Sequence, residues 1–580
     1  MVMTVYERML KQWCDRLLEL QITEKTEPEF YGGILCPSCG RIHGRCFEAM
    51  YPMLYLGKLT GEQKYIDGAA GLFSWSDNLY HQEGFFYNDT NSRWIGTTVF
   101  SAAQFGECLL DFGALLETEL RRRIRERFEQ CAEYLRNNID RIGGNINYPL
   151  TCSYTMAVAH AVTGEKQYAR KAEELAHRVR DYVTEDGLIF GEGHNWQELS
   201  PNGCRPVDIG YNVEESLPAL LQYARMAKDA ETEDFVTGLM GTHLEFMLPD
   251  GAWDNSFGTR NYKWSYWGSR TSDGCFAGYG LVDDPVFREA ARRNLKLIQS
   301  CTCDGLLYGG PMFHTAGEPP CVHHTICHAK ALAMLLTKAE PEQLTKLQNA
   351  DEGATLPAEN REGIRWFPSV RTMLLGKGDW RATITGYDVE YCRCGHPSGG
   401  AVSLLWHRTL GAVLVGTTGT DELVEPNNMQ LLRNATQACL TLRIEYEEDG
   451  RCYRSINDKA TVVQWREDAD RITVEVTGTM TAADQTKGAE YRLQYELSET
   501  GLTVAAVCER EDSSLFLYPV AHGETAEETY FSPVGGMLAF RRGFPMRGDK
   551  GVCCKVEIVE EHLQIRELNP ADRGEAAYEE

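Results

Sequence analysis

The 580-residue sequence lacks several features that identify common classes of protein. It contains no apolar run approaching the roughly 20 residues that a helix needs to cross a bilayer, which argues against a membrane-spanning protein. It is also short of positive charge, because Lys and Arg number 58 against 84 Asp and Glu, for a net charge of −26. A protein that reads nucleic acid through a broad basic face is therefore disfavoured.

The N-terminal segment lacks the uninterrupted apolar stretch of a secretory signal. MVMTVYERMLKQWCDRLLELQ carries charge every few residues and is amphipathic, which predicts a folded helix. In a large chain without an export signal, the 20 cysteines are expected to be reduced thiols, and the expected compartment is the cytoplasm.

Apolar residues recur at helical spacing as far as about residue 337. An internal repeat pairs these segments, because Met53–Phe73 is echoed by Met156–Ala176, each with a Thr-Gly-Glu turn followed by an inward Tyr. Twelve helices are predicted, near residues 3–20, 46–59, 62–80, 97–112, 117–138, 150–162, 165–183, 212–228, 231–247, 271–281, 284–300 and 322–337. An open array would leave apolar faces at its ends, so we expect a closed (α/α)6-type toroid whose last helix packs beside the first.

The pattern changes after the polar segment 338–363. Short alternating runs rich in Val, Thr, Ile and Tyr follow, such as RITVEVTGTM and CCKVEIVEEHLQIREL, which are typical of an antiparallel sandwich. The sequence therefore predicts an α+β multidomain chain, with a helical catalytic toroid at 1–350 and an antiparallel β-sandwich at 351–580.

Five motifs occur in a characteristic order: HGRCFEAMYPMLYL, NINYPL, GHNWQE, DGAWDNSFGTRNYKWSYWGSRTSDG and CGHPSGGAVSLLWH. Together with the order of the two domains, they resemble the heparinase II/III-like polysaccharide lyases. The resemblance implies cleavage of uronic-acid polysaccharides by β-elimination. It also implies a catalytic Asn and His in toroid loops, a Tyr in a later toroid loop and a His from the sandwich. In this sequence these residues are Asn147 or Asn145, His194, Tyr262 and His396.

β-Elimination at a uronate needs a group that neutralises the C5 carboxylate, a base for the C5 proton and an acid for the leaving oxygen. Amides and guanidinium groups suit the first task, and the candidates are Asn145, Asn147, Arg45 and Arg270. Tyr and His suit the proton transfers, although a Tyr base needs neighbouring cations to lower its pKa from about 10. We predict Tyr262 as the main proton-transfer residue, with Tyr266 as the alternative. His194 is its predicted partner, and Asn147 is predicted to bind the carboxylate.

The segment Gly251–Gly274 is unusually dense in aromatic and cationic side chains. Sugar rings stack on aromatic faces, so this density favours a ligand site. The alternative is that the aromatic residues fill the toroid core beneath the sandwich. The predicted substrate contacts in this segment are Trp253, Arg260, Trp264, Trp267 and Arg270.

Substrate contacts are also predicted outside that segment, at His43, Arg45, Trp94, Asn145, Trp196, Tyr211, His314 and His324. Asn145 and Asn147 have a structural alternative, as turn and cap residues of a helix that opens at Pro149. His324 and His328 lie one helical turn apart but lack the Glu of an HExxH motif, so no metal is predicted there.

CPSCG (Cys36–Gly40) is half of a zinc knuckle. Its second half would come from CTC (Cys301–Cys303) or CRC (Cys392–Cys394), and packed reduced thiols are the alternative. No cofactor is predicted to be required for catalysis, so any zinc would be structural.

These observations predict a lyase for an acidic oligosaccharide or polysaccharide, with neither nucleic acid nor membrane as partner. Because a chain of charge −26 repels a polyanion, its cleft needs a local cationic patch, with candidates Arg41, Arg45, Arg93, Arg205, Arg260 and Arg270. One alternative is a glycoside hydrolase using two carboxylates from Asp208, Glu214, Glu215, Asp254 and Asp273. The other is a non-catalytic carbohydrate-binding protein that uses the aromatic residues alone.

Overall fold

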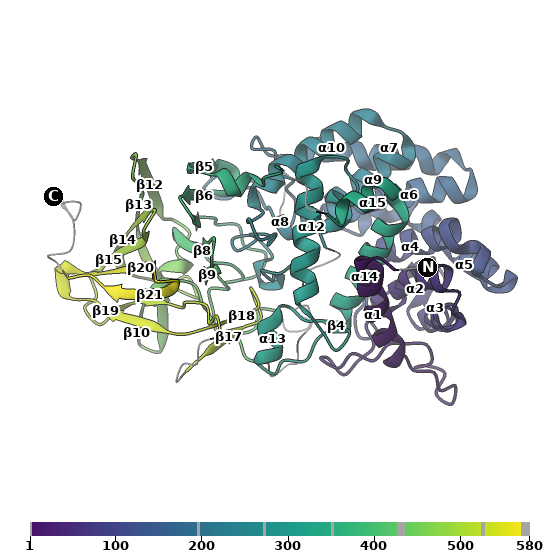
Figure 1. Cartoon of the computed structure of the whole chain (residues 1–580), viewed down its shortest axis with the longest axis horizontal. Helices are drawn as coiled ribbons and strands as arrows, with labels where there is room; N and C mark the ends of the chain where they lie inside the picture. Colours follow the sequence, from purple (N-terminus) through teal and green to yellow (C-terminus); the bar gives the residue numbers. More distant parts are fainter. Residues whose placement is uncertain are drawn as a thin grey trace.

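The computed structural model describes residues 3–193, 198–268, 270, 274–349, 353–425, 431, 435–523 and 528–569. Helices dominate the first part of the chain and strands the second (Figure 1), which confirms the predicted fold class. The last α-helix, α15 (Pro341–Leu347), and the first strand of the sandwich, β5 (Gly363–Phe367), lie on either side of the predicted boundary near residue 350.

The helical part follows the predicted segments closely. Besides α15 it contains α1 (Val5–Glu19), α2 (Met50–Thr60), α3 (Gln63–Trp75), α4 (Thr98–Phe112), α5 (Thr118–Asn138), α6 (Asn147–Thr163), α7 (Lys166–His177), α8 (Ile209–Tyr211), α9 (Leu217–Ala227), α10 (Ala230–His243), α11 (Phe276–Tyr279), α12 (Pro285–Ser300), α13 (Pro311–Thr315) and α14 (Val322–Lys338). The clearest difference is α11, which is much shorter than the helix predicted at 271–281. A left-handed glycine, Gly274 at φ 88°, precedes it and interrupts helical geometry.

The helices pack as consecutive hairpins, and the sequence repeat corresponds to α2–α3 and α6–α7. Each of these two hairpins turns at a glycine in the left-handed conformation, Gly61 at φ 73° and Gly164 at φ 76°, which is a common way to end a helix. The tyrosines that follow these turns, Tyr65 and Tyr168, are buried as predicted. Helix α14 packs against both α1 and α2 (Figure 1), so the last helix of the array lies beside the first.

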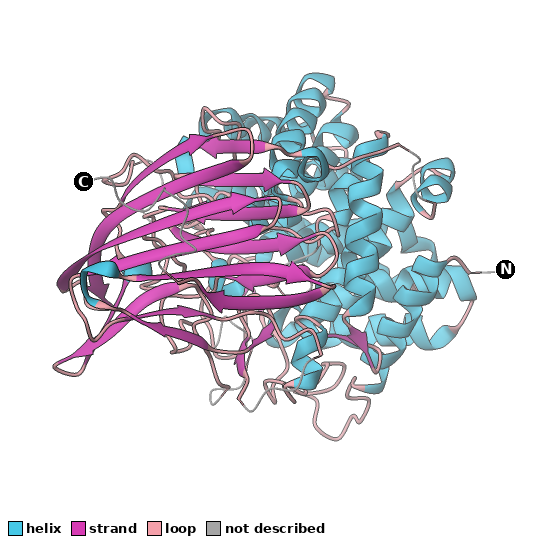
Figure 2. Ribbon diagram, turned by 60° about the vertical axis from the view of Figure 1, so that its left-hand side comes forward, coloured by secondary structure: helices cyan, strands magenta, loops and turns pink. Residues whose placement is uncertain are grey.

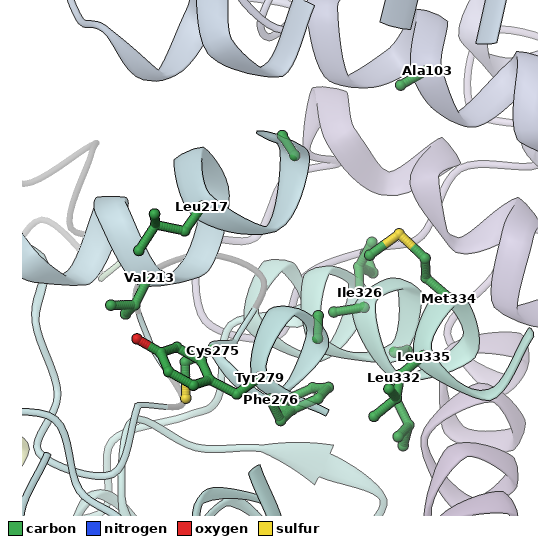
Figure 3. Packing of buried hydrophobic residues seen from close by; sticks show 14 of the residues in the cluster. Ala103, Val213, Leu217, Cys275, Phe276, Tyr279, Ile326, Leu332, Met334 and Leu335 are labelled. Atoms are coloured by element: carbon green, nitrogen blue, oxygen red, sulfur yellow. The ribbon is translucent and has the colours of Figure 1, made fainter. Parts of the chain in front are cut away.

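Buried apolar side chains from distant helices meet inside the helical array. Figure 3 shows Leu217 of α9, Phe276 and Tyr279 of α11, and Ile326 and Leu335 of α14 among these residues. Fully burying an aliphatic or aromatic side chain of this size contributes about 1.5–3 kcal/mol. This shared core fixes the helix ends that carry the polar residues described below.

The second part of the chain forms two large antiparallel sheets (Figure 2). The five-stranded sheet contains β5, β6 (Thr372–Lys377), β7 (Trp380–Thr385), β8 (Ala401–His407) and β9 (Gly411–Val415) in sequence order. The ten-stranded sheet contains β10 (Arg443–Glu448), β11 (Arg451–Arg454), β12 (Val462–Glu467), β13 (Arg471–Ala482), β14 (Lys487–Ser498), β15 (Gly501–Cys508), β16 (Ser514–Leu517), β19 (Arg542–Pro545), β20 (Val552–Val559) and β21 (His562–Glu567). Three two-stranded antiparallel hairpins complete the described strands: β1 (Tyr80–His81) with β2 (Phe85–Phe86), β3 (Thr302–Cys303) with β4 (Leu306–Leu307), and β17 (Tyr530–Ser532) with β18 (Met537–Ala539).

The two large sheets pack face to face. Trp380 and Leu405 from the smaller sheet share one apolar cluster with Val474 and Tyr495 from the larger sheet. Along β15 the residues Leu502, Val504, Ala506 and Cys508 are buried while their neighbours are partly exposed, which is the alternation of a strand with one inner face. These features confirm the predicted antiparallel sandwich.

The five-stranded sheet docks on the helical part through buried hydrogen bonds. Ser256 Oγ donates to Ser403 Oγ at 2.7 Å, and Thr383 Oγ1 donates to Asp254 Oδ2 at 2.5 Å. The amide of Val207 donates to the hydroxyl of Tyr387 at 2.8 Å. The sandwich therefore covers loops at one rim of the toroid, as predicted. None of the described helices is long and apolar enough to span a bilayer.

Candidate active site

A cavity of about 670 Å³ opens where several loops and helix ends of the toroid meet. Its walls come from segments far apart in the sequence: the knuckle region, the loop before α4, the start of α6, the turn before α9, the aromatic segment, α14, and one loop of the sandwich. The lining residues are Arg41, His43, Gly44, Arg45, Asn88, Asp89, Asn91, Ser92, Trp94, Phe100, Gly143, Gly144, Asn145, Asn147, Tyr148, Tyr211, Glu215, Arg260, Lys263, Arg270, His323 and Tyr391.

Cationic side chains are concentrated in this cavity. Five line it, namely Arg41, Arg45, Arg260, Lys263 and Arg270, whereas the acidic lining residues among those described are Asp89 and Glu215. The chain as a whole carries a charge of −26, so this excess is local. A cavity of this kind concentrates anions against the repulsion of the surrounding surface.

Arg260 belongs to this cationic wall and is held by two aromatic rings and one acid. Its guanidinium carbon lies 4.3 Å from the ring centroid of Tyr211 and 4.6 Å from that of Tyr391. One guanidinium nitrogen lies 3.5 Å from the carboxylate of Glu192, which is fully buried. Contacts with the two tyrosine rings and with the acid hold the guanidinium in one position.

Arg45 is oriented by a buried acid, Glu48, which does not itself line the cavity. Its guanidinium makes two hydrogen bonds to Glu48, at 2.6 and 2.9 Å, and Lys330 Nζ contacts the same carboxylate at 3.1 Å. The two cations hold the pKa of Glu48 below its usual range although burial acts in the opposite direction. The same guanidinium lies 4.0 Å from Glu215 and over the ring of Phe100. Arg45 is thus fixed in place before any ligand enters.

Two asparagine amides also line the cavity. Asn147 is the first residue of α6, and its side-chain nitrogen donates to Glu215 while its backbone nitrogen contacts Glu192 at 3.3 Å. The side-chain oxygens of Asn145 and Asn147 are buried and have no hydrogen-bond partner in the described part of the chain. A buried polar atom without a partner costs about 1–3 kcal/mol, so such atoms at a cavity wall indicate a place for a polar ligand.

Three tyrosines line the cavity, and they differ in their surroundings. The hydroxyl of Tyr148 accepts a hydrogen bond from Trp94 Nε1 at 3.1 Å. The hydroxyl of Tyr211 makes no hydrogen bond with any described residue. Burial raises the pKa of Tyr211 well above its usual value, and the positive charge of Arg260 opposes that rise. Tyr211 is therefore a protonated phenol whose hydroxyl is available to a ligand.

Burial shifts two ionisable groups beside Arg260 toward neutrality. It lowers the pKa of Lys263 to about 7, and repulsion from Arg260 acts in the same direction. Burial raises the pKa of Glu192 to about 8, although the contact with Arg260 opposes the shift. Perturbed groups of this kind are typical of proton-transfer sites, because they exchange protons near neutral pH.

The structure brings together eight of the residues that the sequence predicts for the site. These are His43, Arg45, Trp94, Asn145, Asn147, Tyr211, Arg260 and Arg270. The predicted cationic patch is likewise present, with Arg41 as a further member. Two predicted members of that patch lie elsewhere, because Arg93 stacks on Tyr87 and Arg205 stacks on Phe190.

The aromatic residues that the structure describes in Gly251–Gly274 do not line the cavity. Trp253, Trp264, Tyr266 and Trp267 are buried in the core cluster shared by the toroid and the sandwich. The hydroxyl of Tyr266 donates to Asp250, which also accepts from Trp406 Nε1 at 3.0 Å. For these four residues the geometry favours the packing alternative, because they are buried in this cluster and none of them lines the cavity.

The remaining predicted residues lie away from the lining. Tyr262 is fully buried, and its hydroxyl donates to Glu425 at 3.3 Å. Both ring nitrogens of His396 contact backbone carbonyl oxygens, of Val389 at 2.7 Å and Pro397 at 2.9 Å. His314 is exposed on α13, and His324 is buried on α14. His194 and Trp196 lie outside the described residues.

The sequence did not single out several residues of the site. Lys263, Tyr148 and Tyr391 line the cavity, and Glu192 contacts Arg260 from behind the lining. Tyr148 follows Asn147 directly in NINYPL, and Lys263 adjoins Tyr262. Adjacency to a predicted site residue is therefore the one clue to these two residues that the sequence offers. Burial of Lys263 and Glu192 gives these groups their perturbed pKa values, and burial of single loop residues cannot be read from sequence pattern.

Comparison with known proteins adds two family matches and two similar proteins. Residues 10–354 match the model of the ulvan lyase N-terminal domain, and residues 364–532 match that of the ulvan lyase C-terminal domain. A broad-specificity ulvan lyase of Formosa agariphila is 33% identical over 572 residues, covering 93% of this chain and 87% of that protein.

Among solved structures, the Streptomyces coelicolor A3 chondroitin AC lyase in complex with chondroitin sulphate has a similar fold. The TM-score is 0.53 at 12% sequence identity, and the match covers 97% of this chain and 75% of the other. Both the helical part and the sandwich are therefore shared with that structure.

Proposed function

The chain belongs to the ulvan lyase family, and from this premise we propose that its substrate is ulvan or a closely similar uronate polysaccharide. The protein is a polysaccharide lyase that cleaves uronic-acid glycans by β-elimination. The choice of ulvan is supported by the 33% identity with the broad-specificity ulvan lyase over nearly the whole chain.

The cationic cavity is the observation on which the choice of an acidic substrate rests. Four arginines line it on a chain whose net charge is −26, and a neutral glycan would not require that concentration of charge. The amides of Asn145 and Asn147 add groups that bind carboxylates without bringing a charge of their own.

For the carboxylate we propose Asn147, assisted by Arg270. The amide nitrogen of Asn147 carries two protons, and its donation to Glu215 leaves one for the substrate. Arg270 is buried at the cavity wall, where water does not screen its charge. These groups would stabilise the negative charge that builds on the carboxylate as the C5 proton leaves.

For the proton transfers we propose Lys263 as the base and Tyr211 as the acid. The neutral amine of Lys263 takes the C5 proton, the electron pair forms the C4–C5 double bond, and the C4–O bond to the leaving sugar breaks. The Tyr211 phenol gives its proton to the leaving oxygen, and the Lys263 ammonium supplies the proton that restores the phenol. The high pKa of Tyr211 suits this task, because the phenol stays protonated until an alkoxide develops beside it.

This assignment replaces Tyr262, which the sequence favoured. Tyr262 lies outside the lining and is bonded to Glu425, whereas Tyr211 lines the cavity with a hydroxyl that no described residue binds. The role predicted for His194, as a partner in the proton transfers, stays a prediction. We also propose a distant kinship with the heparinase II/III-like lyases, which the order of the five motifs supports.

The glycoside hydrolase alternative finds little support in the cavity. Asp208 accepts backbone hydrogen bonds from Tyr211 and Arg260, and Asp254 accepts from Thr383 beneath the sandwich. Of the four described candidate acids, Glu215 is the one that lines the cavity. A hydrolase requires two carboxylates facing one sugar bond.

The test is absorbance at about 232 nm, which reports the unsaturated uronate formed when a proton is lost beside the carboxylate. Ulvan, other uronate polysaccharides and one neutral glycan would be compared at equal concentration. We expect the fastest increase with ulvan and none with the neutral glycan. Arg270→Gln is expected to lower kcat/KM on ulvan, because it removes charge that stabilises the transition state, while Arg205→Gln, outside the cavity, serves as the matched control. New reducing ends without absorbance would instead indicate a hydrolase.

A further inference from the structure

Three thiols and one imidazole converge beneath the cavity wall. Cys36, Cys39 and His43 come from the N-terminal knuckle region, and Cys321 immediately precedes α14. The sulfur–sulfur distances are 3.5 Å for Cys36–Cys39, 3.7 Å for Cys36–Cys321 and 3.9 Å for Cys39–Cys321. His43 Nε2 lies 3.1 Å from the sulfur of Cys39 and 3.3 Å from that of Cys321. The four ligand atoms thus form a compact cluster.

These distances match the edges of a tetrahedron around one metal ion. With zinc–sulfur bonds of about 2.3 Å and zinc–nitrogen bonds of about 2.0 Å, tetrahedral geometry gives sulfur–sulfur edges of about 3.8 Å and sulfur–nitrogen edges of about 3.5 Å. The observed edges agree with these values to within about 0.4 Å. A disulfide between any two of the thiols would instead require about 2.05 Å.

The local backbone at Cys36 and Cys39 has the form of a metal-binding turn. Leu35 and Ile42 pair as an antiparallel bridge, and the chain reverses between them through Gly40 at φ 64°. The amide of Cys39 donates to the sulfur of Cys36 at 3.4 Å, a bond that stabilises a thiolate. The turn therefore presents both sulfurs toward the same point.

We propose that Cys36, Cys39, His43 and Cys321 bind one zinc ion with a structural role. Sulfur and imidazole ligands in a tetrahedral set are those that zinc prefers. Four protein ligands leave no position for water or substrate, so the ion holds the fold and takes no part in the elimination. This inference is independent of the glycan and of the proton-transfer roles.

The position of the site gives the ion a definite task. The knuckle and Cys321 are 285 residues apart in sequence, and the ion joins them where α14 meets the start of the toroid. His43, Gly44 and Arg45 line the cavity, and so does His323, which lies two residues after Cys321. Zinc therefore fixes two walls of the cavity, and His43 is a positioning residue whose Nε2 is occupied by the metal.

The pairing differs from the one expected from the sequence. CTC and CRC were the expected second half of the knuckle, yet in the described structure the third cysteine of the cluster is Cys321 and the fourth ligand is His43. Cys303 lies instead beside Asp304 and His314, where two of the three groups are exposed. A spacing such as CxxC identifies one half of a site in the sequence, and the fold decides which residues supply the other half.

Metal analysis of the purified full-length protein tests the proposal. We expect one zinc per chain by mass spectrometry, and a decrease in zinc content of at least about tenfold in Cys39→Ser and Cys321→Ser. Cys303→Ser is the matched control and should retain its zinc. Iron in place of zinc, zinc retained in both cluster variants, or zinc lost from Cys303→Ser would overturn the proposal.

A second measurement covers the case in which the cluster variants fail to fold. Protein produced with Co²⁺ in place of Zn²⁺ should show the thiolate charge-transfer and visible bands of tetrahedral cobalt bound by sulfur. Zinc binding should also protect Cys36, Cys39 and Cys321 from alkylation until a chelator is added. Absence of the cobalt bands, or a Cys36–Cys39 disulfide found by peptide mapping of the wild-type protein, would refute the site.

Discussion

Replacing Tyr211 with Phe tests the proposed chemistry directly. The substitution removes one hydroxyl that no described residue binds, and it keeps the ring that packs 4.3 Å from the Arg260 guanidinium. We therefore expect the free energy of unfolding to change by less than about 0.5 kcal/mol. Loss of a general acid typically lowers the rate by a factor of about 10² to 10⁴. At about 1.36 kcal/mol per factor of ten, the activation barrier should rise by about 3 to 5 kcal/mol.

The assay measures kcat and KM separately from the increase in absorbance of the unsaturated product. Because the Tyr211 proton is transferred in the transition state, kcat should fall while KM changes little. Two variants serve as matched controls. Tyr262→Phe removes a buried hydrogen bond to Glu425, and Tyr266→Phe removes one to Asp250. Each control should lower stability by about 1 kcal/mol and leave kcat close to that of the wild type.

Near-normal kcat in Tyr211→Phe would refute the assignment of this residue as the acid. If Tyr262→Phe abolished activity while its Tm stayed close to that of the wild type, the role would return to Tyr262. That result would also mean that the cavity extends to Tyr262 when substrate is bound. Loss of activity in all three variants together with lowered Tm values would show that the tyrosines act through folding.

Four further predictions concern the groups around Arg260. With Lys263 as the base, kcat should rise with pH through about 7 as the amine loses its proton. Lys263→Met should lower kcat by about 10² to 10⁴. A flat pH–rate profile in the wild type would contradict this role. Arg260→Met leaves Glu192 buried without its partner and should cost about 3–5 kcal/mol of stability if the acid is ionised, measured by urea unfolding at pH 9. The pKa of Glu192 in the folded state, about 8, exceeds its usual 4.5, so the protonated carboxyl favours the folded state. This contribution to the free energy of unfolding should be lost as pH rises through about 8. Urea unfolding at pH 5 and pH 9 measures the loss, and Glu192→Gln should abolish it. Asn147→Asp places a second carboxylate against Glu215 and should lower kcat/KM by about 10² to 10³, while Asn147→Gln should retain more activity.

The sequence determined the architecture because secondary structure leaves a periodic signal. One buried face per helix repeats every 3.6 residues, and one buried face per strand repeats every two, so the change of period after residue 337 separates toroid from sandwich. The turns at Gly61 and Gly164 were also visible, since glycine tolerates the left-handed conformation that ends each helix. Closure of the ring followed from the need to bury the apolar faces of the end helices.

Part of the site could be predicted for a different reason. Elimination at a uronate requires cations, amides and phenols, and such residues gather in NINYPL, GRIHGRC and the aromatic segment, which follow or precede predicted helices. Loops at one end of a helical ring converge on its centre, so Arg45, Asn147 and Arg270 were expected near one another. The structure places all three on the walls of the same cavity.

Tertiary structure alone decided which neighbours in those loops face the cavity. Lys263 lines the cavity, whereas the adjacent Tyr262 and Trp264 are buried in apolar clusters. Residues of the sandwich belong to both clusters and cover the side of the loop that carries Tyr262 and Trp264. Irregular loops have no period from which such a division can be read. The same holds for Cys321, which meets Cys36 across 285 residues, and for Lys263 and Glu192, whose pKa values depend on burial by distant segments. These properties depend on contacts distant in sequence, and only the folded chain brings those partners together.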